Sequence, residues 1–359
     1  MTWVAPNRSD PAHSGPRAGL LDGRILFSAL RSLIAFCLLA AACTSASLPP
    51  AGAQERPLDI HSSALPFKLD DQAANTVGQL LWRGGISMKA NSPRFGGWSD
   101  LHVTADGRSL TSISDEGAWL TATIDYDAKG NLAGLSNARI GPLRGLDGQP
   151  LAAKVESDAE GLARLPDGSW LVAFEHHHRL WRYPTLDATP VPFEGPAEIA
   201  RQPKNGGIET LTALGDGRVI AISEEYSVRP GTVMGWIGEP IQGGRYAWRT
   251  FDYATIPDFY PTAIARLPDG SFATIERAFD FVHGVRCRVM RFEASQLKPD
   301  GTVRAQELAR LAVPYAVDNL EGLAATKGAR GETLLWLISD DNFNPLQRNI
   351  LLLFELTAP

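Results

Sequence analysis

One hairpin pattern recurs along this chain of 359 residues. In four copies an Asp-Gly pair separates two short apolar runs, and these pairs begin at Asp106, Asp167, Asp216 and Asp269. Asp-Gly between apolar runs is the strongest short-range signal for a tight hairpin, because both central residues of a type I′ turn need positive φ. A fifth copy, over residues 319–341, has a longer turn near residue 329. The sequence therefore predicts five antiparallel hairpins.

The spacing of these hairpins indicates the architecture. Successive turns are 61, 49, 53 and about 60 residues apart, and a propeller blade of four strands takes roughly 40 to 50 residues. Helical periodicity is nearly absent. We predict an all-β fold, a β-propeller of five to six four-stranded blades, with a β-sandwich as the competing architecture. Residues 77–89 with a terminal strand would form a sixth blade, or residues 77–87 and the C-terminal run would share a closing blade.

The N-terminal segment does not share this pattern. A lead rich in Pro, Gly, Ser and Arg precedes an apolar stretch at residues 26–42, which Arg31 interrupts and small residues follow. This order is typical of an export signal rather than a membrane-spanning helix. We predict an export segment over residues 1–53 and one propeller domain over residues 54–359, in the periplasm or secreted. Two processing routes stay open: cleavage after Ala53, or lipidation of Cys43 to give a membrane-anchored lipoprotein.

Charge and cysteine usage limit the partners. The chain has a formal net charge of −6, which disfavours nucleic acid and allows cation binding. Among its three cysteines only Cys287 falls in the predicted fold, which excludes an intramolecular disulfide there. Gly-x-Ser-x-Gly, phosphate-loop and dinucleotide-binding motifs do not occur in the sequence. We expect a monomer that acts on a small-molecule substrate.

Acidic residues flank the hairpins at both ends. In three copies, an acid at the start of the first strand lies fifteen residues before an acid at the end of the second. These ends meet at one edge of an antiparallel hairpin, so the acids are predicted to converge at one mouth of a central channel. The three pairs are Asp100 with Asp115, Glu160 with Glu175, and Glu209 with Glu224.

A cluster of carboxylates repels itself unless cations intervene. Calcium takes roughly six to eight oxygen ligands with flexible geometry, and it is the predicted ion. Zinc is disfavoured because paired His or Cys ligand spacing is missing from the sequence. Each acid alone could instead cap a strand or face water. The candidate metal ligands are Asp115, Glu116, Glu160, Glu209, Glu224, Glu321 and Asp340.

Three further residues at this edge are candidate catalytic groups. Arg277 has a planar guanidinium suited to phosphate or carboxylate, and it directly follows Glu276, the second candidate. His176 opens a run of three histidines after Glu175 and could protonate a leaving group. The arginine could equally pair with the carboxylates, and the histidine loop could be solvated.

Several short motifs at this edge resemble those of the phytase-like family, whose members are described as having esterase-like activity. The resemblance runs from about Leu80 to Leu356. It implies a propeller, export, and a hydrolase related to calcium-dependent propeller phytases, in which an acidic channel mouth holds calcium ions that position phosphate and activate water. The motifs are Ser114-Asp-Glu-Gly117, Asp158-Ala-Glu-Gly161, Gly207-Ile-Glu209, Asp318-Asn-Leu-Glu-Gly322, and Ser339-Asp-Asp-Asn-Phe343 with downstream Gln347.

The expected function is thus an exported calcium-dependent hydrolase of phosphoesters or related esters, with Arg277 steadying the charge that develops on the substrate. Two alternatives stay open. One is a calcium-stabilised propeller lactonase or carboxylesterase. The other is a non-enzymatic propeller that binds calcium structurally and a ligand or protein through its loops. All three would place the same acids on the same scaffold.

Overall fold

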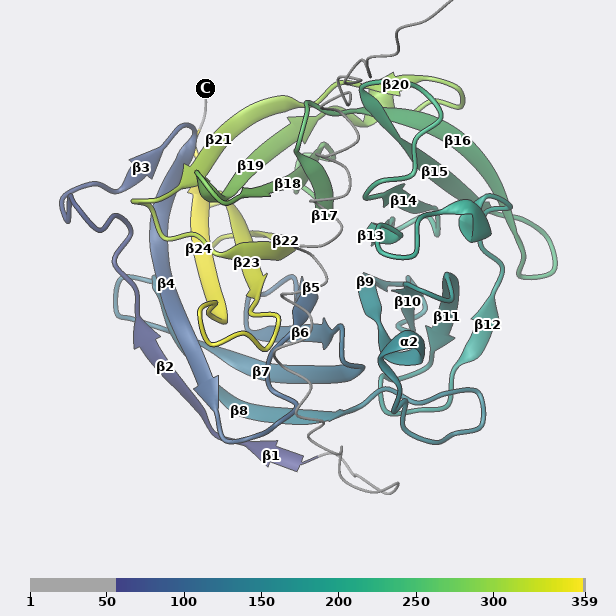
Figure 1. Cartoon of the computed structure of the whole chain (residues 1–359). Helices are drawn as coiled ribbons and strands as arrows, with labels where there is room; N and C mark the ends of the chain where they lie inside the picture. The colour runs from purple at the N-terminus through teal and green to yellow at the C-terminus, as the bar shows by residue number, and fades with distance from the viewer. Residues whose placement is uncertain (1–55, 358–359) are drawn as a thin grey trace, which may run out of the picture. The chain divides into compact units, whose positions relative to one another are not determined.

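The structure, a computed structural model, describes residues 56–357. Its strands form five small sheets arranged around one axis, and the innermost strands of the five sheets surround the centre (Figure 1). The predicted all-β propeller is therefore confirmed, with five blades in the described part of the chain. Within that part, no helix is long and apolar enough to cross a membrane. The predicted export segment lies outside the described residues.

The first three blades each start with one of the predicted hairpins, whose first strand is innermost. Blade 1 contains β5 (Trp98–Val103), β6 (Ser109–Ser114), β7 (Ala118–Tyr126), β8 (Leu132–Pro142) and β1 (Arg56–Leu58). Blade 2 contains β9 (Ala159–Arg164), β10 (Trp170–Phe174), β11 (Arg179–Tyr183) and β12 (Val191–Phe193). Blade 3 contains β13 (Ile208–Ala213), β14 (Val219–Ser223), β15 (Thr232–Pro240), β16 (Tyr246–Ala254) and β20 (Thr302–Val303).

The last two blades complete the ring, and the final one joins both parts of the chain. Blade 4 contains β17 (Tyr260–Arg266), β18 (Phe272–Asp280), β19 (Gly284–Phe292) and β21 (Gln306–Ala312). Blade 5 contains β22 (Asn319–Lys327), β23 (Thr333–Asp340), β24 (Ile350–Leu356), β4 (Leu80–Ala90) and β2 (Ile60–Ala64), with β3 (Thr76–Val77) beside β4. Because β4 pairs with β24, the N-terminal run and the C-terminal run share a closing blade and form no sixth one. Short helices lie between blades: α2 (Lys154–Ser157), η1 (Ile199–Arg201) and η2 (Ala294–Gln296).

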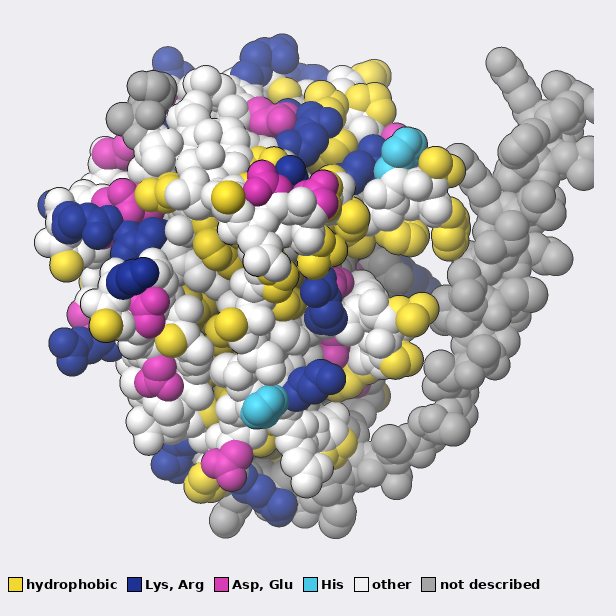
Figure 2. Space-filling model, turned by 90° about the vertical axis from the view of Figure 1, so that its left-hand side faces the viewer, with side chains coloured by type: hydrophobic (Ala, Val, Ile, Leu, Met, Phe, Trp, Pro, Cys, Tyr) yellow, Lys and Arg dark blue, Asp and Glu magenta, His cyan; other side chains and the backbone are white. Residues whose placement is uncertain are grey.

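The blades are held together by apolar packing between neighbouring sheets. The buried apolar side chains form five clusters, one at each junction between successive blades. Trp336, for example, lies in the cluster that joins blade 5 to blade 1, and both its ring faces are out of contact with water. The outer side that carries β2, β3 and β4 shows basic and acidic side chains interspersed (Figure 2). Apolar contacts between neighbouring blades, rather than charged groups on the surface, therefore hold the ring of blades closed.

Each inner strand carries a β-bulge at the same place, one step from the end where the hairpin acids lie. At a bulge, two residues on one strand oppose one residue on its partner, which re-aims the extra side chain. The extra residues, one per blade in chain order, are Ser99, Glu160, Glu209, Thr262 and Glu321. Three glutamates are thus presented from equivalent positions around the axis.

Candidate functional site

A second set of equivalent positions follows directly after the pairs that flank these bulges. In each hairpin, the residue of the inner strand just before the bulge pairs with a residue of the second strand. The position of interest is the next residue along the second strand. These next residues are Asp115, Glu175, Glu224, Arg277 and Asp340, in blade order. Four acids and one arginine therefore share one structural position. We call these residues, the three bulge glutamates and Asp158 the acidic ring.

Blade 2 supplies a compact group of carboxylates, and a lysine links it to Asp115 of blade 1. One oxygen from each of Asp158, Glu160 and Glu175 lies within 4.8 Å of the others. Lys154, at the start of α2, places its ammonium 2.5 Å from Asp158 Oδ1 and 2.6 Å from Asp115 Oδ2. The remaining oxygen of Asp158 lies 3.0 Å from Nε2 of His176. The group could hold a cation with oxygen ligands, and a lysine already neutralises part of it.

The position of Glu175 is fixed by the loop that enters blade 3. The backbone N–H of Gly206 donates to Glu175 Oε1 at 2.6 Å, and the N–H of Gly207 donates to the same oxygen. A Cβ at Gly207 would lie 2.7 Å from the ring of His178 and 3.2 Å from Glu175 Oε1, so this close approach needs glycine. Two backbone N–H groups therefore hold the carboxylate of Glu175 in place through Oε1.

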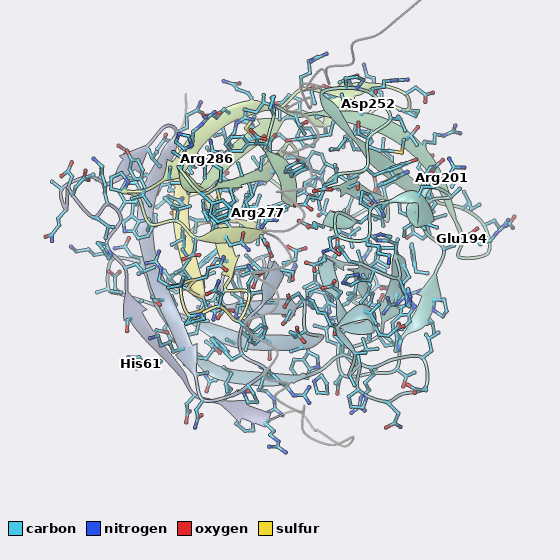
Figure 3. All side chains as sticks on the ribbon, viewed as in Figure 1. His61, Glu194, Arg201, Asp252, Arg277 and Arg286 are labelled. Carbon is cyan, nitrogen blue, oxygen red and sulfur yellow. The ribbon has the colours of Figure 1, made fainter. Side chains whose placement is uncertain are left out.

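Blades 3 to 5 supply the other half of the acidic ring, organised by an arginine. Arg277 donates from Nη2 to Glu224 Oε1 at 3.1 Å, and its Nη1 lies 3.0 Å from Glu321 Oε1. Nη1 also donates to Oδ1 of Asn319 at 2.5 Å, and Nδ2 of Asn319 donates to Glu321 Oε1 at 2.8 Å. Figure 3 shows Arg277 beside the centre of the ring of blades. The guanidinium is thus the main counter-ion on this side.

Burial and mutual repulsion govern protonation in the acidic ring. Burial is the largest cause that raises the pKa of Glu160, Glu209 and Asp340 well above the ordinary range, and neighbouring carboxylates raise it further. Burial alone would lower the pKa of Arg277 and Lys154, but the carboxylates around them raise both. Oε2 of Glu209 is buried without a hydrogen-bond partner among residues 56–357. The site carries more negative charge than its own cations neutralise.

This excess predicts a pH-dependent stability in metal-free protein. Burial, helped by neighbouring acids, raises the pKa of Glu175 and of Glu321 from 4.5 to about 7. A raised carboxyl pKa means that the folded state binds more protons than the unfolded state between these values, so stability is present below pH 4.5 and lost as the pH rises through 7. Denaturant titration in chelator should show a loss of about 1 kcal/mol or more across this window, because one pKa unit corresponds to about 1.4 kcal/mol.

Calcium should remove this loss, because the ion binds the deprotonated carboxylates. A metal-free stability that rises between pH 5 and 7 would contradict the raised pKa values of Glu175 and Glu321.

Most predicted site residues meet at this end of the propeller, but three of the predicted acids do not join the acidic ring. The carboxylate of Glu276 is fully buried and accepts from Arg288 Nη1 at 2.6 Å and from the Tyr253 hydroxyl at 3.0 Å. Because β18 continues to Asp280, Glu276 and Arg277 point to opposite faces of the strand. The prediction of a catalytic Glu276 beside Arg277 is therefore not supported by its placement.

Asp100 and Glu116 are the other two. The bulge residue of blade 1 is Ser99, so Asp100 is turned away and its carboxylate accepts the N–H groups of Leu101 and Leu162 at 2.7 and 2.8 Å. Glu116 is half-buried one residue beyond Asp115, where its N–H donates to the Ser114 hydroxyl. The structure thus pairs blade 1 with blade 2 through Asp100 and leaves Asp115 as the ring acid of blade 1.

Sequence reasoning missed several members of the site. The sequence marks Asp158 only as part of a motif, although its spacing of two residues from Glu160 along an extended segment places both side chains on one side. Glu175 was paired with Glu160 but not proposed as a ligand. Lys154 comes from the connection between blades, where no periodic pattern marks it.

The chain is similar to one protein family and to several solved structures. A family model described as "Phytase-like: Esterase-like activity of phytase" matches residues 93–343. Curated proteins gave no match. Solved structures that resemble the chain include the α-L-arabinofuranosidase PaAbf62A from Podospora anserina, at 11% identity and a TM-score of 0.46, covering 77% of this chain and 97% of that one.

Two others are the catalytic domain of Coprinopsis cinerea GH62 α-L-arabinofuranosidase, at 11% identity and a TM-score of 0.47, covering 79% and 99% of the two chains, and a putative gluconolactonase, at 12% identity and a TM-score of 0.35, covering 89% and 99%. Similarity at this level says nothing about the activity of this chain.

Proposed function

The chain belongs to the phytase-like family, whose model matches residues 93–343, and we propose that it is a calcium-dependent hydrolase of phosphoesters or related esters. The observation that carries this proposal is the acidic ring: three carboxylates of blade 2 lie within 4.8 Å of one another, and at the same end of the propeller Arg277 pairs with Glu224 and Glu321. Such a site can hold a hard cation and an anionic ester together, because the cation offsets the repulsion between the carboxylates and the ester.

The donor set fits calcium. The close group of Asp158, Glu160 and Glu175 offers carboxylate oxygens only, which calcium prefers. Among the described residues, Oε2 of Glu209 is buried and has no hydrogen-bond partner. A bound ion would supply the partner that this oxygen lacks. When bound, calcium would neutralise ester oxygens and lower the pKa of a coordinated water. The residues that would hold it are Asp158, Glu160 and Glu175, whose carboxylate oxygens lie close enough together to share one ion.

The chain's own residues would orient the ester and move protons. Arg277 is held by Glu224 and Glu321 with its guanidinium at the ring, where it can donate to an anionic oxygen of the substrate. Glu175, whose Oε1 accepts the N–H groups of Gly206 and Gly207, is held in place as one of the carboxylates that would bind the ion. His176 is held through Nε2 by Asp158, at the rim, where its ring can hold a proton for a leaving group.

The test is product release from phosphomonoesters, phosphodiesters, carboxyl esters and lactones by the purified protein, with calcium and with chelator. Calcium-dependent phosphate release is expected. Release confined to carboxyl esters or lactones would replace the phosphoesterase assignment by a calcium-dependent carboxylesterase or lactonase. Calcium-dependent stabilisation without turnover on any substrate would contradict an enzymatic role and support a binding propeller.

We further propose that the protein acts outside the cytoplasm, because residues 26–42 are apolar and small residues follow them. Cell fractionation of the full-length protein and of Cys43→Ser tests this. A soluble periplasmic or secreted product in both cases would indicate cleavage after Ala53, and membrane release only by Cys43→Ser would indicate lipidation. Retention in the cytoplasm would overturn the proposal.

A further inference from the structure

The most exposed apolar side chains of the described residues gather at the end of the propeller that carries the acidic ring. They are Leu346, which is 90% exposed, Val282 at 85%, Phe281 at 81% and Val313 at 73%. Each lies in a loop that begins where a strand reaches the site end: after β23, β18 and β21. Exposed apolar side chains that cluster in this way mark binding surfaces, whereas single exposed apolar residues are common on any soluble protein.

One hairpin connects this apolar surface directly to the acidic ring. Strand β18 contributes Arg277 to the ring and continues to Asp280, which pairs with Gly284 of β19. Side chains two residues apart share a face of a strand, so Phe279 follows Arg277 on the same face, roughly 7 Å further along. Ala278, between them, is buried on the other face. The rings of Phe279 and Phe281 then meet edge to face with centroids 5.5 Å apart.

Neighbouring segments widen this strip into a shelf. Across the sheet of blade 4, Ala278 pairs with Arg286 and Arg286 pairs with Ala312. One residue further along the three strands, Phe279 pairs with Val285, and Val313 follows Ala312 beside them. Leu69, which is 67% exposed, donates its N–H to the carbonyl of Pro314 at 2.9 Å. We call Leu69, Phe279, Phe281, Val282 and Val313 the apolar shelf. It starts two residues beyond Arg277 on β18 and ends at the hairpin tip.

The charges around the shelf are already paired. Asp280 binds His283 and Arg286 at 3.0 and 2.5 Å, and Lys68 lies 3.3 Å from Asp70. The shelf therefore offers contact area without a net charge of its own, and the charge that selects a ligand lies next to it, at Arg277. A ligand that matches both parts has an anionic ester group at one end and an apolar group at the other.

We propose that the apolar shelf is a substrate subsite, and that the substrate is an amphiphilic ester whose alkyl or aryl group lies on Phe279, Phe281 and Val282 while its ester group lies at Arg277. This inference rests on the proposed function, because it names the substrate class of the same site. The shelf binds the part of the substrate that does not react. It therefore sets specificity, and removing it should raise KM more than it lowers kcat.

The test uses calcium-loaded, full-length protein and two non-hydrolysable probes, methylphosphonate and octylphosphonate, the latter below its micelle-forming concentration. Calorimetry should show octylphosphonate binding at least about tenfold tighter, because each buried methylene is worth roughly fourfold in Kd. The double variant Phe281→Ser/Val282→Ser should lose this preference and bind methylphosphonate unchanged. Both side chains are exposed, so the fold does not depend on them. Leu346→Ser, an equally exposed change in the loop after β23, is the matched control and should keep the preference.

Turnover of alkyl esters of increasing chain length provides the second readout. Rising kcat/KM with chain length in the wild type, and a flat series in the double variant, would support the subsite. Equal binding of the two probes, or an unchanged preference in the double variant, would overturn it. A preference for octylphosphonate without turnover on any ester would instead refute the proposed function and leave the subsite standing. Cosedimentation with neutral lipid vesicles that depends on Phe281 and Val282, without a probe preference, would assign the shelf to a lipid surface and overturn the subsite.

Discussion

Replacing Glu160 by Gln is expected to abolish calcium-dependent ester hydrolysis and to weaken calcium binding by about tenfold to a hundredfold. Glu160 is the bulge residue of blade 2, and its carboxylate lies within 4.8 Å of those of Asp158 and Glu175. Burial and the charges of Asp158, Glu175 and Glu209 raise its pKa well above the ordinary range. The same change should therefore stabilise the protein when no cation is present, because it removes one of the repelling charges without changing the side-chain shape.

This opposite effect on the two states is the signature to measure. Thermal unfolding with calcium and with chelator should show a higher Tm for Glu160→Gln than for the wild type in chelator, and a smaller gain on adding calcium. Glu194→Gln is the matched control, since Glu194 is exposed at the periphery of the propeller (Figure 3) and should change neither value. A Glu160→Gln protein that gains as much from calcium as the wild type, with full turnover, would remove Glu160 from the metal site.

The architecture was predictable because short local motifs, the hairpin turns, determine it. Asp-Gly pairs mark where four of the five hairpins reverse, and the distance between turns fixes how much chain each blade receives. The type I′ geometry expected of these turns is not found, because only the glycine of each pair has positive φ. The strand-like runs at both ends of the fold allowed either a shared closing blade or a sixth blade. The number of blades stayed open in the sequence, since the pairing of β4 with β24 is a contact between residues more than 260 positions apart.

The membership of the acidic ring was only partly predictable, because register decides it. Asp100 and Glu160 begin the same fifteen-residue interval, yet the bulge in blade 1 falls on Ser99 and turns Asp100 away from the axis. A displacement of one residue moves a side chain to the other face of a strand. Spacing alone does not reveal a bulge, so it does not predict the direction in which the side chain of Asp100 points.

Blade 4 shows the same limit in another form. Arg277 occupies the position that acids hold in the other four blades, and Glu276 takes the place of Ser114, Phe174 or Ser223 on the opposite face. In the sequence both residues simply stand at the end of an apolar run. The long β18 strand, which continues past the site, separates them, and this continuation also builds the hairpin of the apolar shelf. One departure from the repeat thus supplies both the ring's arginine and its apolar neighbour.

Replacing Arg277 by Met should lower the free energy of unfolding of metal-free protein at pH 8 by about 3 to 5 kcal/mol, the usual cost of breaking a buried ion pair by removing one partner. Arg277 binds Glu224 and Glu321, and Asn319 is tied to the same group. Without it, burial would leave these carboxylates without their counter-ion. The cost should shrink at pH 5, because the pKa of Glu321 is about 7 and its carboxyl is protonated there.

Two further variants separate charge pairing from packing. Arg277→Met/Glu321→Gln should recover part of the loss at pH 8, since the second change removes a charge that the first left unpaired. Arg201→Met, at an exposed position on the periphery (Figure 3), should stay within about 0.5 kcal/mol of the wild type. Denaturant titration of the four proteins at both pH values measures these differences. An equal loss for Arg277→Met at pH 5 and pH 8, with no recovery in the double variant, would mean that Arg277 contributes packing rather than the positive charge on which the acidic ring depends.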